Sequence, residues 1–268
     1  MNRTPVVFVH GAWLHALSWE AWVERFTSRG FRALAPGWPG EAATARETRR
    51  SPGPLAGLDL DGLAEHYAGI VRSLDAPPVI IGHSVGGLIA QRLVAADVGR
   101  AAVAIAPAPI NQVPLPGAPV LLRPSAGGAG GDRLVTLSPA QFHQVLANTA
   151  TAGESGRLFE RYAVPAPRSL LTDLGCGGAA RSPLAGVDTA TARRGPLLLI
   201  SGQEDRLVPD AVTRAVYKQY GDSVAVTDLK QFADRAHSLT IDGGWRLVAD
   251  HVLGWLEERG VRPLTVRG

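Results

Sequence analysis

The chain has 268 residues, 46% of them apolar and 19% charged, which suits one α/β domain, alone or with an insertion. Its single cysteine, Cys176, excludes an intrachain disulfide and a multi-thiolate zinc site, and no apolar run reaches the roughly 18 residues of a membrane span. Most of the basic residues behind the net charge of +3 are scattered arginines, so we expect no nucleic-acid partner, and the lack of a long apolar run leads us to expect no membrane partner. The first residues lack a signal-peptide pattern, and we expect a cytoplasmic protein.

Short apolar or β-branched runs alternate along the chain with amphipathic stretches of helical period. This alternation predicts an α/β fold with a mostly parallel sheet of about six strands and helices on both faces. We expect the strands at residues 6–9, 31–34, 79–81, 101–105, 197–200 and 224–228. We expect the helices at residues 19–28, 60–73, 85–97, 209–220 and 244–259, with Trp19, Trp22 and Phe26 packed in the core.

The alternation stops between residues 107 and 194. This segment opens with six prolines, continues with a Gly-rich run at 127–131 that we expect to be mobile, and holds two short helical patterns at 139–148 and 154–162. Because it is too long for an ordinary loop, we interpret it as a cap inserted over the sheet. The chain then divides into a first core part at 1–106, a cap at 107–194 and a second core part at 195–268.

The strongest chemical signal is the GHSVGG motif at residues 82–87, which follows an apolar strand and opens a helical stretch. A serine on so tight a strand-to-helix turn has a strained backbone, and the glycines two residues before and after Ser84 relieve the crowding. The turn exposes the Ser84 hydroxyl at the carboxyl end of the sheet, beside a helix N-terminus that favours developing negative charge. The motif therefore predicts that Ser84 is a nucleophile.

A serine nucleophile needs a base that a carboxylate holds in place, and both lie downstream. Asp205 follows the strand expected at 197–200, and His237 lies on the loop after the last expected strand. Because the carboxyl ends of parallel strands meet at one edge, this order predicts that Ser84, Asp205 and His237 converge there.

Other residues compete for these two roles. Glu204 is the rival carboxylate, but the short side chain of Asp205 and the Val-Pro pair that follows at 208–209 favour Asp205. The remaining histidines fit the base poorly because of where we expect them: His66 and His251 within helices, His143 in the cap, and His83 on the turn itself, pointing away.

The loop after the first strand supplies a further element of acyl-transfer chemistry. Such a reaction needs two N–H donors aimed at the tetrahedral oxyanion. We expect the N–H of Val85, directly after the nucleophile, and the N–H of Ala12, with Gly11 giving the backbone freedom to turn. We interpret His10 as a structural residue that orders this loop, and Trp13 as a substrate-binding or simply packed side chain.

The His-Gly pair at 10–11, the Gly-x-Ser-x-Gly-Gly motif, Asp205 and His237, in this order, resemble the α/β-hydrolase superfamily. Within it, residues 10–13 and the proline-rich cap are most similar to small bacterial esterase-like hydrolases and plant methyl esterases. The resemblance covers the whole chain except much of the cap. It implies an α/β-hydrolase fold with an inserted cap, a catalytic triad formed by the three residues above, and an oxyanion hole formed by the two N–H groups.

Two departures from the family pattern leave this chemistry untouched. The chain starts at what would be the family's third strand, so we expect one or two edge strands to be missing, and residues 35–40 lack an aspartate that many members carry. Haloalkane dehalogenases and epoxide hydrolases carry an aspartate at the position of Ser84. Hydroxynitrile lyases carry a threonine and a lysine where this chain has Gly11 and Ser238, so these activities are not expected.

The expected function is that of a cofactor-independent serine hydrolase without a metal. It would cleave a carboxylic ester or thioester of a small, largely apolar substrate through an acyl-enzyme. Two alternatives stay open: an acyltransferase, cyclase or haloperoxidase-like perhydrolase with the same triad, and a ligand-binding receptor on the hydrolase fold. We make no prediction of the oligomeric state or of the natural substrate.

Overall fold

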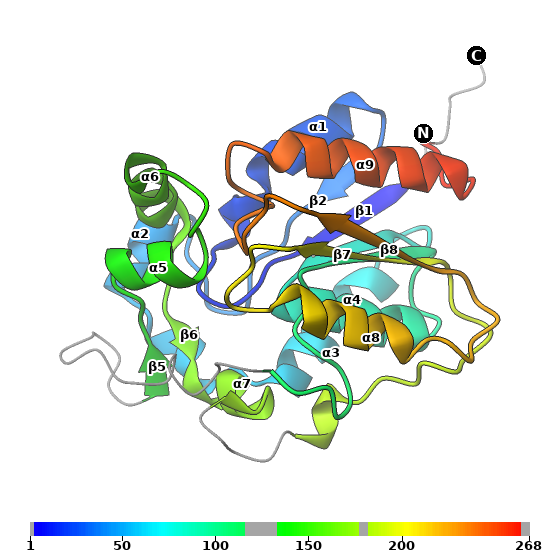
Figure 1. Cartoon of the computed structure of the whole chain (residues 1–268), viewed down its shortest axis with the longest axis horizontal. Helices are drawn as coiled ribbons and strands as arrows, with labels where there is room; N and C mark the ends of the chain where they lie inside the picture. Colours follow the sequence, from blue (N-terminus) through cyan, green and yellow to red (C-terminus); the bar gives the residue numbers. More distant parts are fainter. Residues whose placement is uncertain (1–2, 116–132, 177–181, 264–268) are drawn as a thin grey trace.

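The computed structural model describes residues 3–115, 133–176 and 182–263. Six strands of this part form one sheet of order β2–β1–β3–β4–β7–β8, and every neighbouring pair is parallel (Figure 1). The prediction of a mostly parallel sheet of about six strands is therefore confirmed. The strands are β1 (Pro5–Val9), β2 (Arg32–Leu34), β3 (Val79–His83), β4 (Ala101–Ile105), β7 (Leu197–Gly202) and β8 (Thr227–Phe232).

Successive side chains of the strands enter two separate cores, one on each face of the sheet. On β1, Val6 and Phe8 pack in one core, whereas Val7 and Val9 pack in the other. Helices α1 and α9 cover the first face, and α3, α4 and α8 cover the second, as Figure 1 shows. Their bounds are α1 (Glu20–Ser28), α9 (Trp245–Glu258), α3 (Leu60–Arg72), α4 (Val85–Ala95) and α8 (Asp210–Lys218).

The aromatic residues of the first helical stretch lie in the core, as predicted. Trp19, at the end of a short 3-10 helix (Ala16–Trp19), and both Trp22 and Phe26 on α1 are at most 1% exposed. The Phe8 ring lies 4.9 Å from Trp19 and 5.3 Å from Phe26, centroid to centroid. Burying these four large aromatic rings stabilises this face and packs β1 against α1.

The last expected strand was wrong in its position. Residues 224–226 precede β8, with Val224 85% and Val226 43% exposed, and the strand continues instead to Phe232. β8 is an edge strand whose side chains are mostly half-buried, so burial selects its sequence weakly. The β-branched residues that suggested a strand therefore lie in the turn before it.

Two further elements between β2 and α3 were not expected. Helix α2 (Ala45–Arg50) begins with a reciprocal cap in which Thr44 accepts from the Glu47 N–H and Glu47 accepts from the Thr44 N–H. A 3-10 helix (Gly53–Gly57) follows it. The loop at residues 35–44 directly follows β2. Because β2 pairs in parallel with β1, this loop lies beside the carboxyl end of β1.

The described part of the 107–194 segment lies to one side of the sheet in Figure 1. Its two expected helices are confirmed as α5 and α6, whose caps Ser138 and Thr151 accept from the backbone N–H three residues on. The Gly-rich run at 127–131 lies outside the described residues. The elements are β5 (Leu134–Val135), α5 (Pro139–Val145), α6 (Ala152–Tyr162), β6 (Ala166–Pro167), α7 (Arg168–Asp173) and a 3-10 turn (Pro183–Ala185).

This segment meets the loops that follow β1 and β8. Leu14 and Ala163 form an isolated antiparallel bridge, and the Ser238 N–H donates to the Leu146 carbonyl at 2.8 Å. It therefore lies against the carboxyl ends of the strands. Its division from the core as an inserted cap stays our proposal. In the described ranges, no helix has the length and apolar character to cross a membrane.

Candidate functional site

The turn between β3 and α4, residues 82–87, will be called the elbow. Ser84 has φ 56° and ψ −118°, a backbone conformation that costs energy for a residue with a side chain. A Cβ atom on Gly82 would lie 1.9 Å from the Gly86 carbonyl oxygen, and one on Gly86 would lie 2.0 Å from the Val9 carbonyl oxygen. No side chain fits at either position, so the two glycines are what permits this turn.

Neighbouring backbone holds the elbow in place. The Ser84 N–H donates to the Ile105 carbonyl and the Ala108 N–H donates to the Ser84 carbonyl, both at 2.9 Å. The Ser84 side chain is 6% exposed and does not cap α4. Its hydroxyl therefore stands at the N-terminus of an 11-residue helix, where the helix dipole favours negative charge on an attacked group.

Asp205 and His237 are brought together as the sequence predicted. Asp205 Oδ2 lies 2.7 Å from His237 Nδ1, and both side chains are at most 1% exposed. The other oxygen, Oδ1, accepts the N–H groups of Leu207 and Val208, each at 2.8 Å. With its carboxylate fixed on both oxygens, Asp205 holds the ring with Nδ1–H toward itself and Nε2 free to accept a proton.

The rival residues lie elsewhere in the described structure. Glu204 is exposed, and its backbone carbonyl, not its carboxylate, accepts a hydrogen bond from Asn148. His66 on α3 contacts the Gly37 carbonyl at 3.2 Å, and His251 on α9 packs against Phe232. Among the described contacts, Ser84 Oγ has no hydrogen bond to His237, so that contact stays a prediction.

His83 does not point away from the site, and in this the expectation was wrong. Its Nε2–H donates to the His237 carbonyl at 2.9 Å, and the two rings lie 4.5 Å apart between centroids. Burial, together with the nearby His237, holds the pKa of His83 well below its ordinary value, so the ring is neutral. His83 directly precedes Ser84, so its contact attaches the loop of His237 to the elbow. No sequence signal announces this contact, because the two residues are 154 positions apart.

A glycine at the end of β7 allows the His237 loop to cross close to the sheet. A Cβ atom on Gly202 would lie 2.2 Å from the Arg235 carbonyl oxygen. On the other side of His237, the Ser238 hydroxyl donates to Asp242 Oδ2 at 2.9 Å. The backbone on both sides of the histidine is thus fixed by packing and by a buried hydrogen bond.

Residues 10–15, which follow β1 and contain the predicted oxyanion donor Ala12, will be called the oxyanion loop. A Cβ atom on Gly11 would lie 2.6 Å from Ser84 Cβ and 3.3 Å from Ser84 Oγ, so this loop lies directly against the serine. The predicted donors Ala12 and Val85 are 4% and 1% exposed. Within the described residues, no hydrogen bond from either N–H to a protein acceptor is found. Both groups are therefore available to a bound oxyanion.

Trp13 is buried rather than open to a ligand. It is 3% exposed, has φ 63°, and its indole N–H donates to the Val135 carbonyl at 3.0 Å. Its backbone carbonyl accepts from Val164 at 3.1 Å, and the neighbouring His15 N–H donates to Tyr162 at 2.9 Å. Trp13 thus attaches the oxyanion loop to the 107–194 segment, and its contact with a substrate stays a prediction.

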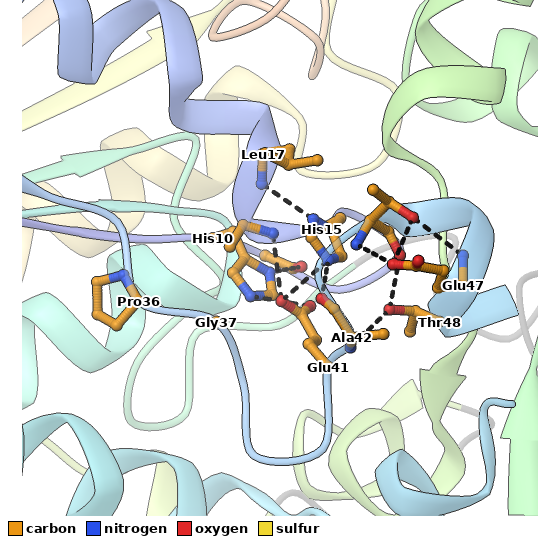
Figure 2. Close-up of polar contacts among 12 residues, drawn as sticks. His10, His15, Leu17, Pro36, Gly37, Glu41, Ala42, Glu47 and Thr48 are labelled. Atoms are coloured by element: carbon orange, nitrogen blue, oxygen red, sulfur yellow. Dashed lines mark hydrogen bonds and ion pairs between the residues drawn. The ribbon is translucent and has the colours of Figure 1, made fainter.

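A buried carboxyl group, which we did not predict, lies beside the oxyanion loop. Glu41 Oε1 is 3.2 Å from His10 Nε2, and Glu41 Oε2 is 3.8 Å from His15 Nε2; Figure 2 shows the three side chains facing one another. Burial raises the pKa of Glu41 to about 7 and lowers the pKa of His10 to about 4. His10 is also stacked on Trp38 at 4.7 Å.

In the described parts of the chain, no cluster of three or more His, Cys, Asp or Glu side chains suits a metal ion. A surface cavity of about 1050 Å³ lies at the opposite edge of the sheet, lined by Arg29, Arg100 and the end of α9. It is remote from Ser84, since both arginines precede the amino ends of their strands.

The chain is similar to known proteins over nearly its whole length. Residues 6–251 match the alpha/beta hydrolase family. A Bacillus subtilis protein of the AB hydrolase superfamily is 25% identical over 247 residues, which is 87% of this chain and 84% of that protein. A non-heme chloroperoxidase of Streptomyces lividans is 38% identical over 103 residues, covering 38% of this chain and only 35% of the chloroperoxidase.

Among solved structures, a methylesterase from Arabidopsis superimposes with a TM-score of 0.66. The match covers 95% of this chain and 99% of the methylesterase, at 16% sequence identity. At that identity the likeness bears on the fold, not on the substrate.

Proposed function

This chain belongs to the alpha/beta hydrolase family and has its fold, and we propose that it is a serine hydrolase that cleaves carboxylic esters or thioesters. The observation that carries the proposal is the buried 2.7 Å contact between Asp205 Oδ2 and His237 Nδ1. His237 is joined through its carbonyl to His83, the residue directly before Ser84, whose own strained backbone presents its hydroxyl at a helix N-terminus.

The proposed reaction begins when Ser84 Oγ attacks the carbonyl carbon and His237 Nε2 takes the hydroxyl proton. The carbonyl oxygen becomes an oxyanion that accepts from the N–H groups of Ala12 and Val85. Collapse of this intermediate breaks the bond to the leaving alcohol or thiol, which takes the proton from His237. Asp205 stabilises the imidazolium while it carries the charge.

The second half of the reaction releases the acid. A water molecule gives a proton to His237 and attacks the acyl-enzyme, and the Ser84 oxygen leaves with that proton. Because Ser84 is 6% exposed and the core on this side of the sheet includes the apolar Ala12 and Val85, we expect an acyl group that is small and uncharged. This supports a small, largely apolar ester substrate.

The proposal is tested with a fluorophosphonate probe and p-nitrophenyl esters of short acids. We expect the wild-type protein to be labelled and to turn over, and Ser84→Ala to lose labelling and at least about 10⁴-fold in rate. Ser73→Ala is the matched control, because Ser73 ends α3 and its hydroxyl bonds only to the Ile70 carbonyl. Absence of labelling and turnover in the wild type would favour the receptor alternative.

A specific observation favours a second acceptor for the acyl group. The segment of 38% identity belongs to a non-heme chloroperoxidase, so we also propose perhydrolysis, in which hydrogen peroxide replaces water. Peroxide would attack the acyl-enzyme and leave as a peracid, with His237 moving the same proton. Measuring peracid against free acid at rising peroxide concentration separates the two: a constant, negligible peracid fraction eliminates the second proposal.

A further inference from the structure

We propose that Glu41 is a positioning residue for the oxyanion loop, holding His10 and thereby the Ala12 N–H in the geometry that stabilises the oxyanion. This inference rests on the proposed function for its catalytic consequence. Glu41 lies on the loop at residues 35–44, hereafter the Glu41 loop, and touches no predicted catalytic residue itself.

The two oxygens of the Glu41 carboxyl reach both ends of the oxyanion loop. Oε1 lies 3.2 Å from His10 Nε2, at its beginning. Oε2 accepts the Ala16 N–H at 3.3 Å, directly after its end, and lies 3.8 Å from His15 Nε2. The side chain is 3% exposed, so these protein groups take the place of water around it. One carboxyl group thus spans the loop that contains Gly11 and Ala12 (Figure 2).

The Glu41 loop is itself fixed. The Glu41 N–H donates to the Trp38 carbonyl at 3.0 Å, and the Tyr67 hydroxyl of α3 donates to the Pro36 carbonyl at 2.9 Å. A Cβ atom on Gly37 would lie 2.6 Å from Glu41 Oε2, so the backbone closes tightly around the carboxyl. Trp38 covers the face of the His10 ring. The carboxyl therefore has a rigid base from which to hold His10.

The link from His10 to the reaction is short. His10 is followed by Gly11, which is packed against Ser84, and then by Ala12, the predicted donor. Oxyanion stabilisation depends on donor positions to a fraction of an ångström, so rotation of the backbone at His10 changes the rate of acylation more than it changes substrate binding. A positioning role thus predicts a defect in kcat rather than in KM.

The contact between His10 and Glu41 requires one shared proton. His10 Nδ1 lies 3.1 Å from the Gly11 carbonyl, an acceptor, so Nδ1 carries a hydrogen and the neutral ring presents a lone pair at Nε2. Among the described residues, neither His10 Nε2 nor Glu41 Oε1 has a hydrogen bond to another group, so a neutral carboxyl can face this lone pair, whereas a carboxylate repels it. The pKa values of about 7 for Glu41 and about 4 for His10 support placing the proton on Glu41.

Other titratable groups face the same carboxyl. His15 comes from the oxyanion loop, Tyr67 from α3, and His66 of α3 contacts the Glu41 loop at the Gly37 carbonyl. The pKa of Tyr67 is raised well above its ordinary value by burial and by Glu41, so it stays neutral over the working range. His15 is the group among these whose positive charge lowers the pKa of Glu41, but burial has the larger effect and raises it.

The test compares Glu41→Gln with Glu41→Leu. Glutamine keeps a neutral side chain with a donor beside His10 Nε2, so we expect near wild-type kcat at pH 6 and no decline at alkaline pH. The leucine has similar size without a donor, and we expect a kcat lower by about 10- to 100-fold with KM changed less than threefold. Glu47→Gln is the control, because Glu47 is exposed and only caps α2.

Hydrogen exchange of the peptide at residues 9–14 provides a readout that does not need activity. We expect faster exchange in Glu41→Leu and wild-type exchange in Glu41→Gln. The inference is overturned if Glu41→Leu keeps both wild-type kcat and wild-type exchange, or if Glu41→Gln is as defective as Glu41→Leu. If the wild type neither labels nor turns over, the proposed function fails, and exchange alone decides whether Glu41 positions the loop. If Glu41→Leu does not fold, the pH profile of Glu41→Gln decides.

Discussion

Two neighbouring regions are held by different kinds of contact: the elbow that contains Ser84, and the region of His237 and the oxyanion loop. The elbow requires the absence of side chains, because Cβ atoms on Gly82 and Gly86 would lie 1.9 and 2.0 Å from backbone atoms. His237 and the oxyanion loop instead depend on buried polar contacts. Asp205 Oδ2 lies 2.7 Å from His237 Nδ1, and Glu41 Oε1 lies 3.2 Å from His10 Nε2. The two regions meet where Gly11 packs against Ser84.

This difference separates what depends on protons from what does not. Steric exclusion of a Cβ atom is independent of pH and leaves one tolerated residue, so the elbow is either formed or lost. The polar contacts instead have charge states, and their strength follows the pKa values of the groups. We therefore expect substitutions in the elbow to change the free energy of unfolding. We expect substitutions in the polar contacts of His237 and the oxyanion loop to change kcat and the dependence of stability on pH.

The largest expected effect is a loss of kcat when the contact between Asp205 and His237 is changed. Asp205→Asn keeps the shape of the side chain but lets it donate to His237, which favours the wrong tautomer. We expect kcat to fall by about 10⁴-fold while the free energy of unfolding changes far less. Ester turnover and urea unfolding of the same samples check this. A loss of activity that merely follows a loss of folded protein would contradict the catalytic role of Asp205.

A smaller effect, in energy, is expected at the elbow. Gly86→Ala brings a Cβ atom 2.0 Å from the Val9 carbonyl oxygen, and we expect a loss of about 3 kcal/mol or more in unfolding free energy, equal at every pH. Gly69→Ala is the matched control, because Gly69 lies inside α3 with no atom within 4 Å of the added Cβ. That variant should be more stable by about 0.5–1 kcal/mol. Equal effects of the two substitutions would break the comparison.

The smallest effect is a change in the pH dependence of stability when the Glu41–His10 pair is broken. With Glu41 alone, as in His10→Gln, the folded-state pKa is raised from 4.5 to about 7, so stability is full below pH 4.5 and is lost as pH rises through 7. With His10 alone, as in Glu41→Gln, the folded-state pKa is lowered from 6.5 to about 4, so stability is full above pH 6.5 and is lost as pH falls through 4.

In the wild type these two slopes oppose each other between pH 4.5 and 6.5, because folding moves one proton from histidine to glutamate without net uptake. Each variant should therefore depart from the wild type by at most about 3 to 4 kcal/mol, one as pH rises and the other as pH falls. Urea unfolding across pH 4 to 8 measures the difference between each variant and the wild type. Parallel curves for all three proteins would refute the shared proton.

The sequence predicted the sheet and the elbow well because both depend on local pattern. Continuous apolar runs mark buried parallel strands, and the glycines at 82 and 86 are required within four residues of each other. Asp205 and His237 were predicted from their places after strands, and their contact is found, whereas their catalytic role remains our proposal. Strand β8 was misplaced because an edge strand carries less burial information.

Long-range polar contacts could not be predicted in the same way. Glu41 is a single carboxylate on a loop, and nothing in its neighbourhood of the sequence distinguishes it from exposed Glu47. Its contact with His10 depends on the pairing of β1 with β2, which places the Glu41 loop beside the oxyanion loop. His83 is similar, since its partner His237 comes from a loop beyond the far edge strand.

The bridge between Leu14 and Ala163 limits how far the 107–194 segment of this protein can be exchanged. Residues 162–164 pair with the oxyanion loop, and the Arg49 guanidinium of α2 binds the Ala163 carbonyl at 2.7 Å from the other side. A graft that exchanges residues 107–194 to alter selectivity would also replace one wall of the oxyanion loop. Chimeras that retain residues 162–164 would keep that wall, and they would also need the carbonyls of Val135 and Leu146, which accept from Trp13 and Ser238.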